Sequence, residues 1–295
     1  MKVRSDAAHV AVTRRSAAGG AARLEPMTEA HLPEALRLSQ QAEWPHRVED
    51  WQFVLGLGHG TVALADGAVV GTAIWWPMGD RLAAVGMVIV DTAMRSCGLG
   101  RALMLAAMAE ARAAGITEFQ LCATQAGMPL YEKLGYRASV EIHQHQGIVT
   151  GAPDAGAARI VARPDLAALT ALDAAATGAR RGPMLAALLD AGQVAVIEAA
   201  GRIVGYSVLR DFGRGKVIGP VIARDAAEAA ALIGIWLQGL QGQFVRLDTP
   251  ADSGIRDLLA DLGMAACGGG MEMRTAATRT APSLRRFGLT NQALG

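Results

Sequence analysis

The residues whose types and spacing could do chemistry lie in one short segment near position 95. A β-branched run, Val88–Val90, is typical of a buried strand. Arg95, Gly98 and Gly100 follow in an R-x-x-G-x-G pattern, and strong helix formers fill residues 101–113. A glycine turn between a strand and a helix presents the unpaired N–H groups of the helix start to an anion. The segment therefore predicts a binding site for a pyrophosphate.

Two other glycine-loop sites are excluded by residues. A dinucleotide fingerprint needs a third glycine where this chain has Leu103. It also needs an acid near the end of the next strand, but the strand expected at 116–121 is followed by Cys122 and alanine. A Walker loop needs Lys and then Ser or Thr after its last glycine, whereas Gly100 precedes Arg101 and alanine.

Composition limits the remaining classes of protein. The chain has 295 residues, which suggests one large or two ordinary domains, and its 52% hydrophobic content is ample for buried cores. A net charge of +1 gives no case for a nucleic-acid or membrane-surface partner, and no apolar run approaches the ~18 residues of a membrane span. The three cysteines form no C-x-x-C, so we expect no metal site and no disulfide framework. A reducing cytoplasm is the expected compartment.

The chain repeats itself. A strand, turn and strand pattern around Gly71 recurs around Gly205, 134 positions later. A Leu-Gly pair ending at Gly135 recurs at Gly263, 128 positions later. Because the two landmarks recur at nearly the same offset, the sequence predicts two copies of one domain. The joint is expected at residues 147–158, which are rich in glycine and contain proline.

Periodicity and turn residues place the elements of each copy. Besides the hairpins around the two glycines, the first copy is expected to hold strands at 23–25, 82–90, 116–122 and 136–146 and helices at 29–41, 47–57, 101–113 and 128–134. The second is expected to hold strands at 159–162, 217–222 and 244–248, helices at 165–175, 184–191, 226–239 and 255–262, and a last strand. Residues 1–22 are expected to be a disordered tail. Residues 275–295 are expected to be a C-terminal tail whose Phe287, Leu289 and Leu294 could dock on a domain.

This order of elements, with V-x-x-x-x-R-x-x-G-x-G at Val90–Gly100 and L-Y-E-K-L-G-Y at Leu130–Tyr136, resembles the GNAT superfamily of N-acetyltransferases. Over residues 23–273 the chain is similar to a tandem subgroup of that superfamily. The marks of the subgroup are Glu43–His46, Asp50–Trp51, Leu121–Thr124 and Ile218–Ala223. The resemblance implies an α+β fold with a mixed, mostly antiparallel sheet flanked by helices. It also implies two tandem GNAT-like domains, a catalytic one at 23–147 and a degenerate one at 158–274.

The resemblance also implies the donor and the residues that hold it. Acetyl-CoA would supply the acyl group, with its pyrophosphate on the turn and its pantetheine arm paired with backbone groups of Val88 and Val90. Tyr131 would act as the general acid that protonates the leaving thiolate. The residues expected to hold the donor at the turn are Arg95, Ser96, Cys97, Gly98, Leu99, Gly100 and Arg101.

The sequence indicates the general base and the residues that bind the acceptor amine less clearly than it indicates the donor site. The strand before the turn carries no acid, so a general base on that strand is not expected. Candidates elsewhere for the base or for acceptor binding are Glu43, Trp44, His46, Asp50, Glu141 and His143. Trp51 could wall an acceptor pocket or pack in the core. The function implied is direct transfer of acetyl to the amine of a small molecule, and oligomers are possible. The alternative is a non-catalytic acyl-CoA sensor or regulatory module.

The second copy lacks both features of the site. The repeat places Arg224–Ala229 where the glycine turn would be, and no glycine occurs there. Asp225 is expected to cap a helix, with Glu228 completing a capping box, so a carboxylate would occupy the place of a phosphate. Leu259 stands at the position equivalent to Tyr131. We therefore expect the second copy neither to bind CoA in the usual way nor to catalyse.

Overall fold

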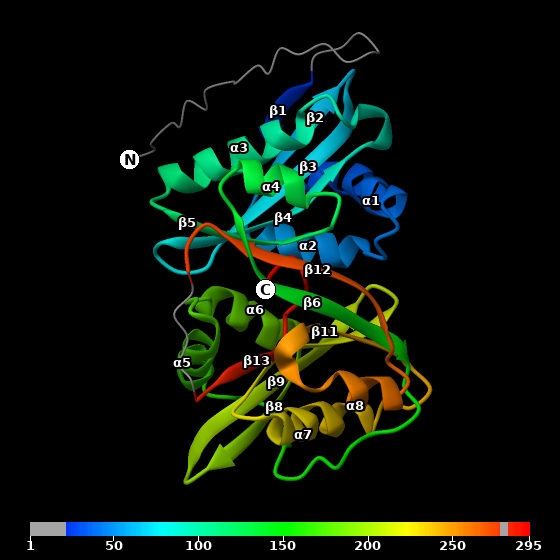
Figure 1. Ribbon diagram of the computed structural model, residues 1–295, viewed down its shortest axis with the longest axis vertical. Helices are drawn as coiled ribbons and strands as arrows, with labels where there is room; N and C mark the ends of the chain where they lie inside the picture. Colours follow the sequence, from blue (N-terminus) through cyan, green and yellow to red (C-terminus); the bar gives the residue numbers. More distant parts are fainter. Residues whose placement is uncertain (1–21, 278–282) are drawn as a thin grey trace. The chain divides into compact units, whose positions relative to one another are not determined.

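The computed structural model describes residues 22–277 and 283–295 (Figure 1). These form two compact units, one made of residues up to 75 together with 87–113, and one made of residues 76–86 together with 114–295. Apart from Ala22, the predicted N-terminal tail lies outside the described residues. Within the described ranges, no helix combines the length and apolarity needed to cross a membrane. Those ranges also contain no group of three or more His, Cys, Asp or Glu side chains that could hold a metal ion.

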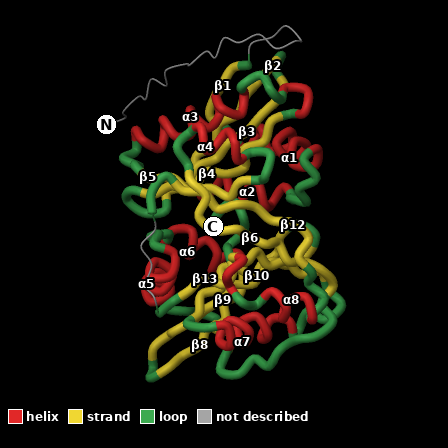
Figure 2. The backbone as a smooth tube through the Cα atoms, in the orientation of Figure 1, coloured by secondary structure: helices red, strands yellow, loops and turns green. Residues whose placement is uncertain are grey.

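The first unit holds an antiparallel β1-β2-β3 sheet and its helices, and β3 and β4 continue into the second unit. Its elements are β1 (Arg23–Pro26), η1 (Glu29–His31), α1 (Leu32–Gln41), α2 (Val48–Leu57), β2 (His59–Ala65), β3 (Ala68–Pro77), β4 (Leu82–Val90), η2 (Thr92–Met94) and α3 (Leu99–Ala113). The predicted helix at 101–113 therefore begins two residues earlier, at Leu99. The α+β class is confirmed, with strands flanked by helices (Figure 2).

The second unit contains the remaining elements. They are β5 (Glu118–Ala123), α4 (Met128–Lys133), β6 (Arg137–Ile148), β7 (Arg159–Val161), α5 (Leu166–Thr177), α6 (Gly182–Ala191), β8 (Gly192–Ala199), β9 (Arg202–Phe212), β10 (Gly215–Ala223), α7 (Ala226–Leu237), β11 (Phe244–Pro250), η3 (Ala251–Ser253), α8 (Arg256–Asp261), β12 (Ala266–Arg274) and β13 (Arg285–Gly288). The strands predicted between 136 and 146 are one strand, β6, because no turn residue interrupts its pairing with β11.

Both predicted hairpins have the same turn. Asp66 and Gly67 connect β2 to β3 with φ of 50° and 83°, and Ala200 and Gly201 connect β8 to β9 with φ of 50° and 73°. Two left-handed residues in a two-residue loop are the turn whose twist matches that of paired strands. The shared geometry supports the repeat that the sequence predicts.

The glycine that marks each hairpin lets a helix approach the sheet closely. A Cβ built on Gly71 would lie 2.8 Å from Leu103 Cδ1 of α3, and one on Gly205 would lie 3.3 Å from Leu232 Cδ1 of α7. The apolar face of α3 repeats every three or four residues and is buried. Each copy therefore packs its central helix over its hairpin at the same glycine.

The two copies exchange strands within the second unit. Strand β12 comes from the second copy and lies between β5 and β6 of the first, where Met271 is opposite Ala123 on one side and Glu141 on the other. Strand β6 in turn pairs with β11, where His145 is opposite Leu247. All three pairings are antiparallel, whereas β4–β5 and β10–β11 are parallel. A strand from each copy therefore completes the sheet of the other.

The C-terminal residues belong to the fold of the second unit. Strand β13 pairs antiparallel with β10, although the sequence predicts only a tail there. Phe287, Leu289 and Leu294 are buried, which confirms that they dock.

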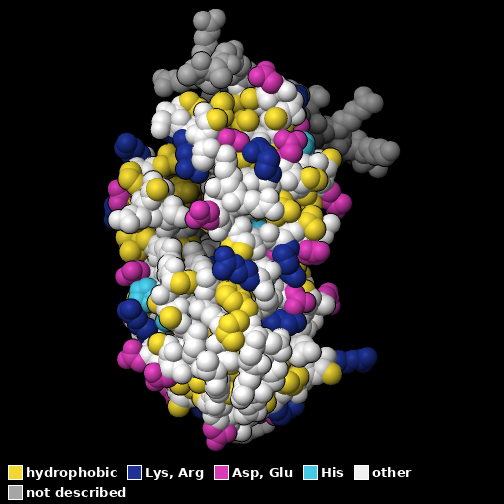
Figure 3. Space-filling model, turned by 90° about the vertical axis from the view of Figure 1, so that its right-hand side faces the viewer, with side chains coloured by type: hydrophobic (Ala, Val, Ile, Leu, Met, Phe, Trp, Pro, Cys, Tyr) yellow, Lys and Arg dark blue, Asp and Glu magenta, His cyan; other side chains and the backbone are white. Residues whose placement is uncertain are grey.

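Acidic and basic side chains are interspersed on the face drawn in Figure 3, so that face carries no extended charge of one sign.

Candidate active site

The glycine turn has the geometry of an anion site. Ser96 and Gly98 adopt left-handed φ values of 63° and 86°, and both are exposed. The first helical hydrogen bond of α3 is donated by Ala102 N to Gly98 O at 3.0 Å. Among the described residues, no acceptor pairs with the N–H groups from Ser96 to Arg101. The donors that a phosphate would need are therefore unpaired, in a turn whose Ser96 and Gly98 are exposed to solvent.

Asp91 holds the turn in place. Its side chain accepts a hydrogen bond from Ala93 N at 3.0 Å and an ion pair from Arg37 Nη1 of α1 at 3.0 Å. Its backbone N–H donates to Val70 O of β3 at 2.9 Å. Burial alone would raise the pKa of Asp91, but these partners and Gln41 lower it below its usual range. Asp91, just before the turn, is therefore bonded to the sheet through its backbone N–H and to the first helix through its ionised carboxylate.

Strand β4 is irregular where the donor is expected. Met87 has φ of 51°, a strained value for a residue that is not glycine, and its carbonyl accepts from Thr72 Oγ1 at 2.7 Å. Val88 and Val90 beyond it are half-buried. This irregularity lies just before the two residues predicted to pair with a pantetheine arm.

The pairing of β4 with β5 is short. Residues 82–84 pair with 118–120, and in the described part of the chain the pairing goes no further, although β4 continues to Val90 and β5 to Ala123. Backbone groups of residues 121–123 on the β4 side of β5 therefore have no strand partner. Unpaired strand edges of this kind can bind an extended ligand.

Tyr131 lies in α4 with its ring largely buried against Tyr136, with 6.1 Å between ring centroids. Burial, with a smaller contribution from Cys122, raises its pKa to about 12. The phenol therefore keeps its proton at neutral pH, as a general acid must.

The second copy has the same backbone frame around Leu259. Tyr136 N donates to Tyr131 O at 3.1 Å, and Met264 N donates to Leu259 O at 2.9 Å. The equivalence of positions 131 and 259 predicted from the repeat is thus confirmed. Leu259 is fully buried and has no group that could carry a proton.

The second copy also fills its phosphate position with its own carboxylates, as predicted. Asp225 accepts from Glu228 N at 2.9 Å and so caps α7. Glu228 reaches back to Arg224 N at 3.0 Å and pairs with the Arg224 guanidinium. The reciprocal bond reaches one residue before the cap rather than the cap itself. Two carboxylates at this helix start disfavour a bound phosphate.

Several predicted acceptor residues have structural partners. Asp50 is buried, accepts from Arg47 N at 2.8 Å and pairs with the Arg47 guanidinium at 2.9 Å, so it caps α2. His46 Nδ1 lies 3.1 Å from Ser39 Oγ, which also accepts from Trp51 Nε1 at 2.9 Å. Trp51 is fully buried, so its role is core packing rather than walling a pocket.

The remaining predicted acceptor residues lie in both units. Glu43, with φ of 60°, is exposed in the first unit, where Trp44 packs edge-on against His46 at 5.8 Å. In the second unit, His143 Nε2 lies 3.5 Å from Glu141 Oε1. Roles for these residues in binding the acceptor stay predictions.

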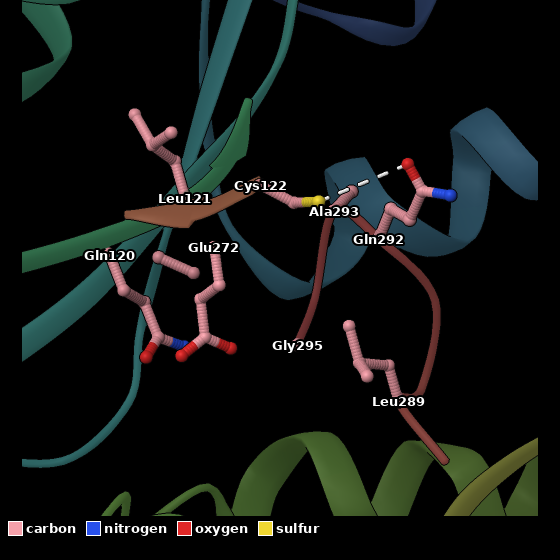
Figure 4. Close-up of a pocket in the computed structure, with 9 residues that line it drawn as sticks. Gln120, Leu121, Cys122, Glu272, Leu289, Gln292, Ala293 and Gly295 are labelled. Carbon is pink, nitrogen blue, oxygen red and sulfur yellow. Dashed lines mark hydrogen bonds between the residues drawn. The ribbon is translucent and has the colours of Figure 1, made fainter. Parts of the chain in front are cut away.

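A small cavity in the second unit is lined in part by residues that sequence reasoning missed (Figure 4). Its volume is about 10 Å³, enough for about one water molecule. The residues that line it are Ala84, Gln120, Leu121, Cys122, Glu272, Leu289, Gln292, Ala293 and Gly295. Burial, together with Asp248 and Glu272, raises the pKa of Cys122 to about 12, and the same thiol influences Tyr131. Isolated glutamines form no motif, so the sequence carried no signal for them.

Comparisons with known proteins identify the family of the chain. A model of the acetyltransferase (GNAT) family matches residues 24–136, and a model of an acetyltransferase (GNAT) domain matches residues 169–286. The uncharacterized N-acetyltransferase YitH of Bacillus subtilis is 30% identical over 247 residues, which cover 80% of this chain and 85% of YitH. The chain belongs to the GNAT acetyltransferase family. It is therefore an acyltransferase with two GNAT domains in tandem.

Solved structures show the same fold at low sequence identity. A Pyrococcus horikoshii protein has a TM-score of 0.78 at 16% identity, over 92% of this chain and 95% of that one. A tandem GNAT protein from the clavulanic acid biosynthesis pathway has a TM-score of 0.62 at 16% identity, over 88% of this chain and all of that one. The GNAT architecture therefore extends over both copies.

Proposed function

We propose that the first GNAT domain transfers an acetyl group from acetyl-CoA to the amine of a small molecule. The observation that carries the proposal is the turn from Ser96 to Arg101 at the start of α3, whose backbone N–H groups have no acceptor among the described residues and which is exposed at Ser96, Gly98 and Arg101. A diphosphate is the part of CoA that such a turn binds, and Arg95 and Arg101 would add charge. Acetyl-CoA supplies the activated acyl group.

The reaction proposed is a direct attack within a ternary complex. The amine nitrogen would form a bond to the thioester carbonyl carbon, and the carbon–sulfur bond would break with its electron pair on sulfur. Tyr131 Oη would donate its proton to that sulfur, and the resulting phenolate would regain a proton from water. The proton lost by the amine would go to water, since β4 carries no acid in the sequence. The backbone of Val88 and Val90 would align the donor arm.

The donor site is tested by Gly98→Glu. A side chain at φ of 86° is strained, and a carboxylate there would repel phosphate. Gly67→Glu is the matched control, because Gly67 has φ of 83°, is exposed and, like Gly98, has open space within 4 Å of the position a Cβ would take. By calorimetry we expect Gly98→Glu to weaken CoA binding about 100-fold or more, as loss of two charge-assisted bonds implies. Equal CoA affinity in the two variants would contradict the proposal.

The alternative is an acyl-CoA sensor that does not catalyse. Tyr131 favours catalysis, because a sensor needs no buried acid with a raised pKa. Thiol release from acetyl-CoA, measured with a panel of primary amines, separates the two functions. CoA binding without amine-dependent thiol release would favour the sensor. The three free cysteines support a reducing compartment, and we propose the cytoplasm.

A further inference from the structure

Strand β6, which belongs to the second unit (Figure 1), carries two histidines that are two residues apart. Side chains at that spacing in a strand point to the same face of the sheet. The ring centroids of His143 and His145 are 6.2 Å apart. His145 is fully buried, and the Nδ1 atom of His143 is buried as well. The proposed transfer assigns no step to either ring.

One nitrogen of each ring, which we name the outer nitrogen, lies beside an acceptor. His143 Nε2 lies 3.5 Å from Glu141 Oε1, towards the start of β6. His145 Nδ1 lies 3.1 Å from Met264 O, which can only accept, so this nitrogen carries the proton of the ring. Met264 is beside Gly147, because a Cβ built on Gly147 would lie 3.5 Å from the Met264 Cα. The two acceptors therefore lie at opposite ends of the histidine pair.

The other two nitrogens, which we name the inner nitrogens, face each other. The two nitrogens of an imidazole point in nearly opposite directions from the ring. His143 Nδ1 therefore points away from Glu141 and towards His145, and His145 Nε2 points away from Met264 and towards His143. Neither atom has a hydrogen-bond partner among the described residues. With the proton of each ring on its outer nitrogen, two lone pairs face one another between the rings.

The spacing and the outer partners of the pair are those of metal ligands. Two opposed lone pairs are stabilised by a positive charge between them. Metal–nitrogen bonds of about 2 Å to each ring, arranged nearly in a line, put the ring centroids about 6 Å apart. The distance between His143 and His145 matches this arrangement. Metal-bound histidines also place their second ring nitrogen against a carboxylate or a backbone carbonyl, as this pair does.

The surroundings favour an ion of low charge with two protein ligands. In the part of the chain that the structure describes, no group of three or more His, Cys, Asp or Glu could hold a metal ion. Zn²⁺ takes four ligands in most proteins. Leu247, opposite His145 on β11, is fully buried, so the neighbourhood is apolar on that side. Burial, followed by the charges of His143 and Arg256, lowers the pKa of His145, so a divalent ion would be costly there.

We propose that His143 and His145 form a two-coordinate site for monovalent copper, Cu⁺, with the ion bound between their inner nitrogens. Imidazole is a common ligand of copper, and Cu⁺ accepts two ligands in a line. Glu141 and the carbonyl of Met264 would hold the two rings in the binding orientation. The cysteines of the chain predict no metal site, but the histidine pair is a different set of donors. The site is independent of the proposed function, since neither ring takes part in the transfer.

A direct measurement of Cu⁺ binding tests the proposal. The full chain, with Cys97→Ser and Cys267→Ser so that these thiolates do not compete, is titrated anaerobically with Cu⁺ in ascorbate against the chelator bicinchoninate. Cys122 stays protonated at neutral pH, because burial raises its pKa to about 12. We expect one bound ion, with two nitrogen neighbours at about 2 Å and no sulfur by X-ray absorption. Sulfur neighbours, or no bound ion, would overturn the proposal.

Substitutions of the ligands give the second test. In the same background, His143→Ala and His145→Ala should each weaken Cu⁺ binding more than about 100-fold, whereas Glu141→Gln should weaken it about 10-fold, as loss of an outer partner does. His59→Ala is the matched control, because His59 Nδ1 also lies near a carboxylate, 3.9 Å from Glu110 Oε1. It should leave the affinity unchanged. Equal affinity in His143→Ala and His59→Ala would overturn the proposal.

The choice of ion and the folding of the variants have their own controls. Zn²⁺ should bind at least about 100-fold more weakly than Cu⁺, because it needs further ligands and brings a second charge into a buried site. Equal affinity for the two ions would overturn a two-coordinate site. Thermal melting of each variant is measured in parallel. If His145→Ala does not melt cooperatively, His143→Ala decides, because the His143 side chain is 17% exposed and its loss disturbs the core less.

Discussion

Tyr131 illustrates how burial prepares a single side chain for proton donation. Because its pKa is about 12, the phenol remains protonated throughout the range in which amines become reactive. We expect Tyr131→Phe to lower kcat about 100-fold while leaving the dissociation constant of CoA within a factor of two, since only the proton is lost. In the unaltered chain, kcat/KM should show no loss near pH 10, where an ordinary tyrosine ionises. A Phe variant with unchanged kcat would remove Tyr131 from the mechanism.

Glu272 makes stability depend on pH through a single carboxylate. Burial alone would raise its pKa, but Arg286 and Arg274 lower it to about 2, with bonds to Arg286 at 2.5 Å and Arg274 at 2.9 Å. A depressed folded-state pKa stabilises the fold above the unfolded value, and this stability is lost as pH falls from about 4.5 towards 2. At pH 7 the contribution is roughly 3 kcal/mol.

Glu272→Gln should therefore unfold at lower urea than the unaltered chain at pH 7, with a difference that shrinks between pH 4.5 and 2.5. The amide leaves two buried guanidinium groups without a countercharge, which is the costly way to break a buried pair. Urea unfolding at pH 7, 4 and 3 measures the difference. A constant difference across these values would show that the effect is packing and not charge.

Residues could be predicted from the sequence where a motif encodes them. The glycine turn and Tyr131 each belong to a motif with a defined residue spacing. In the structure, the turn has unpaired backbone N–H donors and Tyr131 has a raised pKa. The sequence predicts Asp50 as an acceptor residue, but its contacts with Arg47 follow the Ncap-to-N3 spacing of a capping box, a local signal that the sequence did contain. Gln120 and Gln292 are 172 positions apart, and no local pattern brings them together.

At the scale of the element, the glycines that mark the repeat have a packing role. Gly71→Ala would place a Cβ 2.8 Å from Leu103 and 3.2 Å from the carbonyl of Ile89, so α3 must move and its N-terminal turn with it. We expect a loss of about 1–3 kcal/mol of stability and weaker CoA binding. Gly205→Ala, with contacts of 3.0 Å to Ile222 O and 3.3 Å to Leu232, is the matched variant in the second copy.

Gly205→Ala should lose stability without losing CoA affinity, because α7 is capped by carboxylates and is not expected to hold the donor. Denaturant unfolding and calorimetry with CoA measure the two effects. If both alanines weaken CoA binding equally, the donor site is not specific to α3.

Elements follow from local pattern, but their partners do not. Strand β4 occupies 82–90 as predicted, because its β-branched residues and flanking turns are local features. Strand β13 has only four residues, in a basic segment where apolar and polar residues do not alternate, so no hydrophobic period predicts it. The insertion of β12 between β5 and β6 is also invisible in sequence, because alternation fixes the face of a strand and not its neighbour.

At the scale of the whole molecule, the exchanged strands make each copy depend on the other. A chain of residues 22–150 lacks β12, so the edges of β5 and β6 that β12 pairs would be open. A chain of residues 151–295 lacks β6, so β11 and β12 would lose a partner. Long unpaired edges expose backbone donors and acceptors and favour aggregation. We expect neither part alone to show a cooperative urea transition.

The control cuts the chain only after it has folded. A protease site inserted between the exposed residues Gly156 and Ala157 leaves every strand intact. After cleavage the two fragments should elute together in gel filtration and unfold in one transition close to that of the uncut chain, because the pairings of β6 and β12 hold them. Separation of the cut fragments into two folded species would contradict the exchange of strands, since each copy would then have a complete sheet of its own.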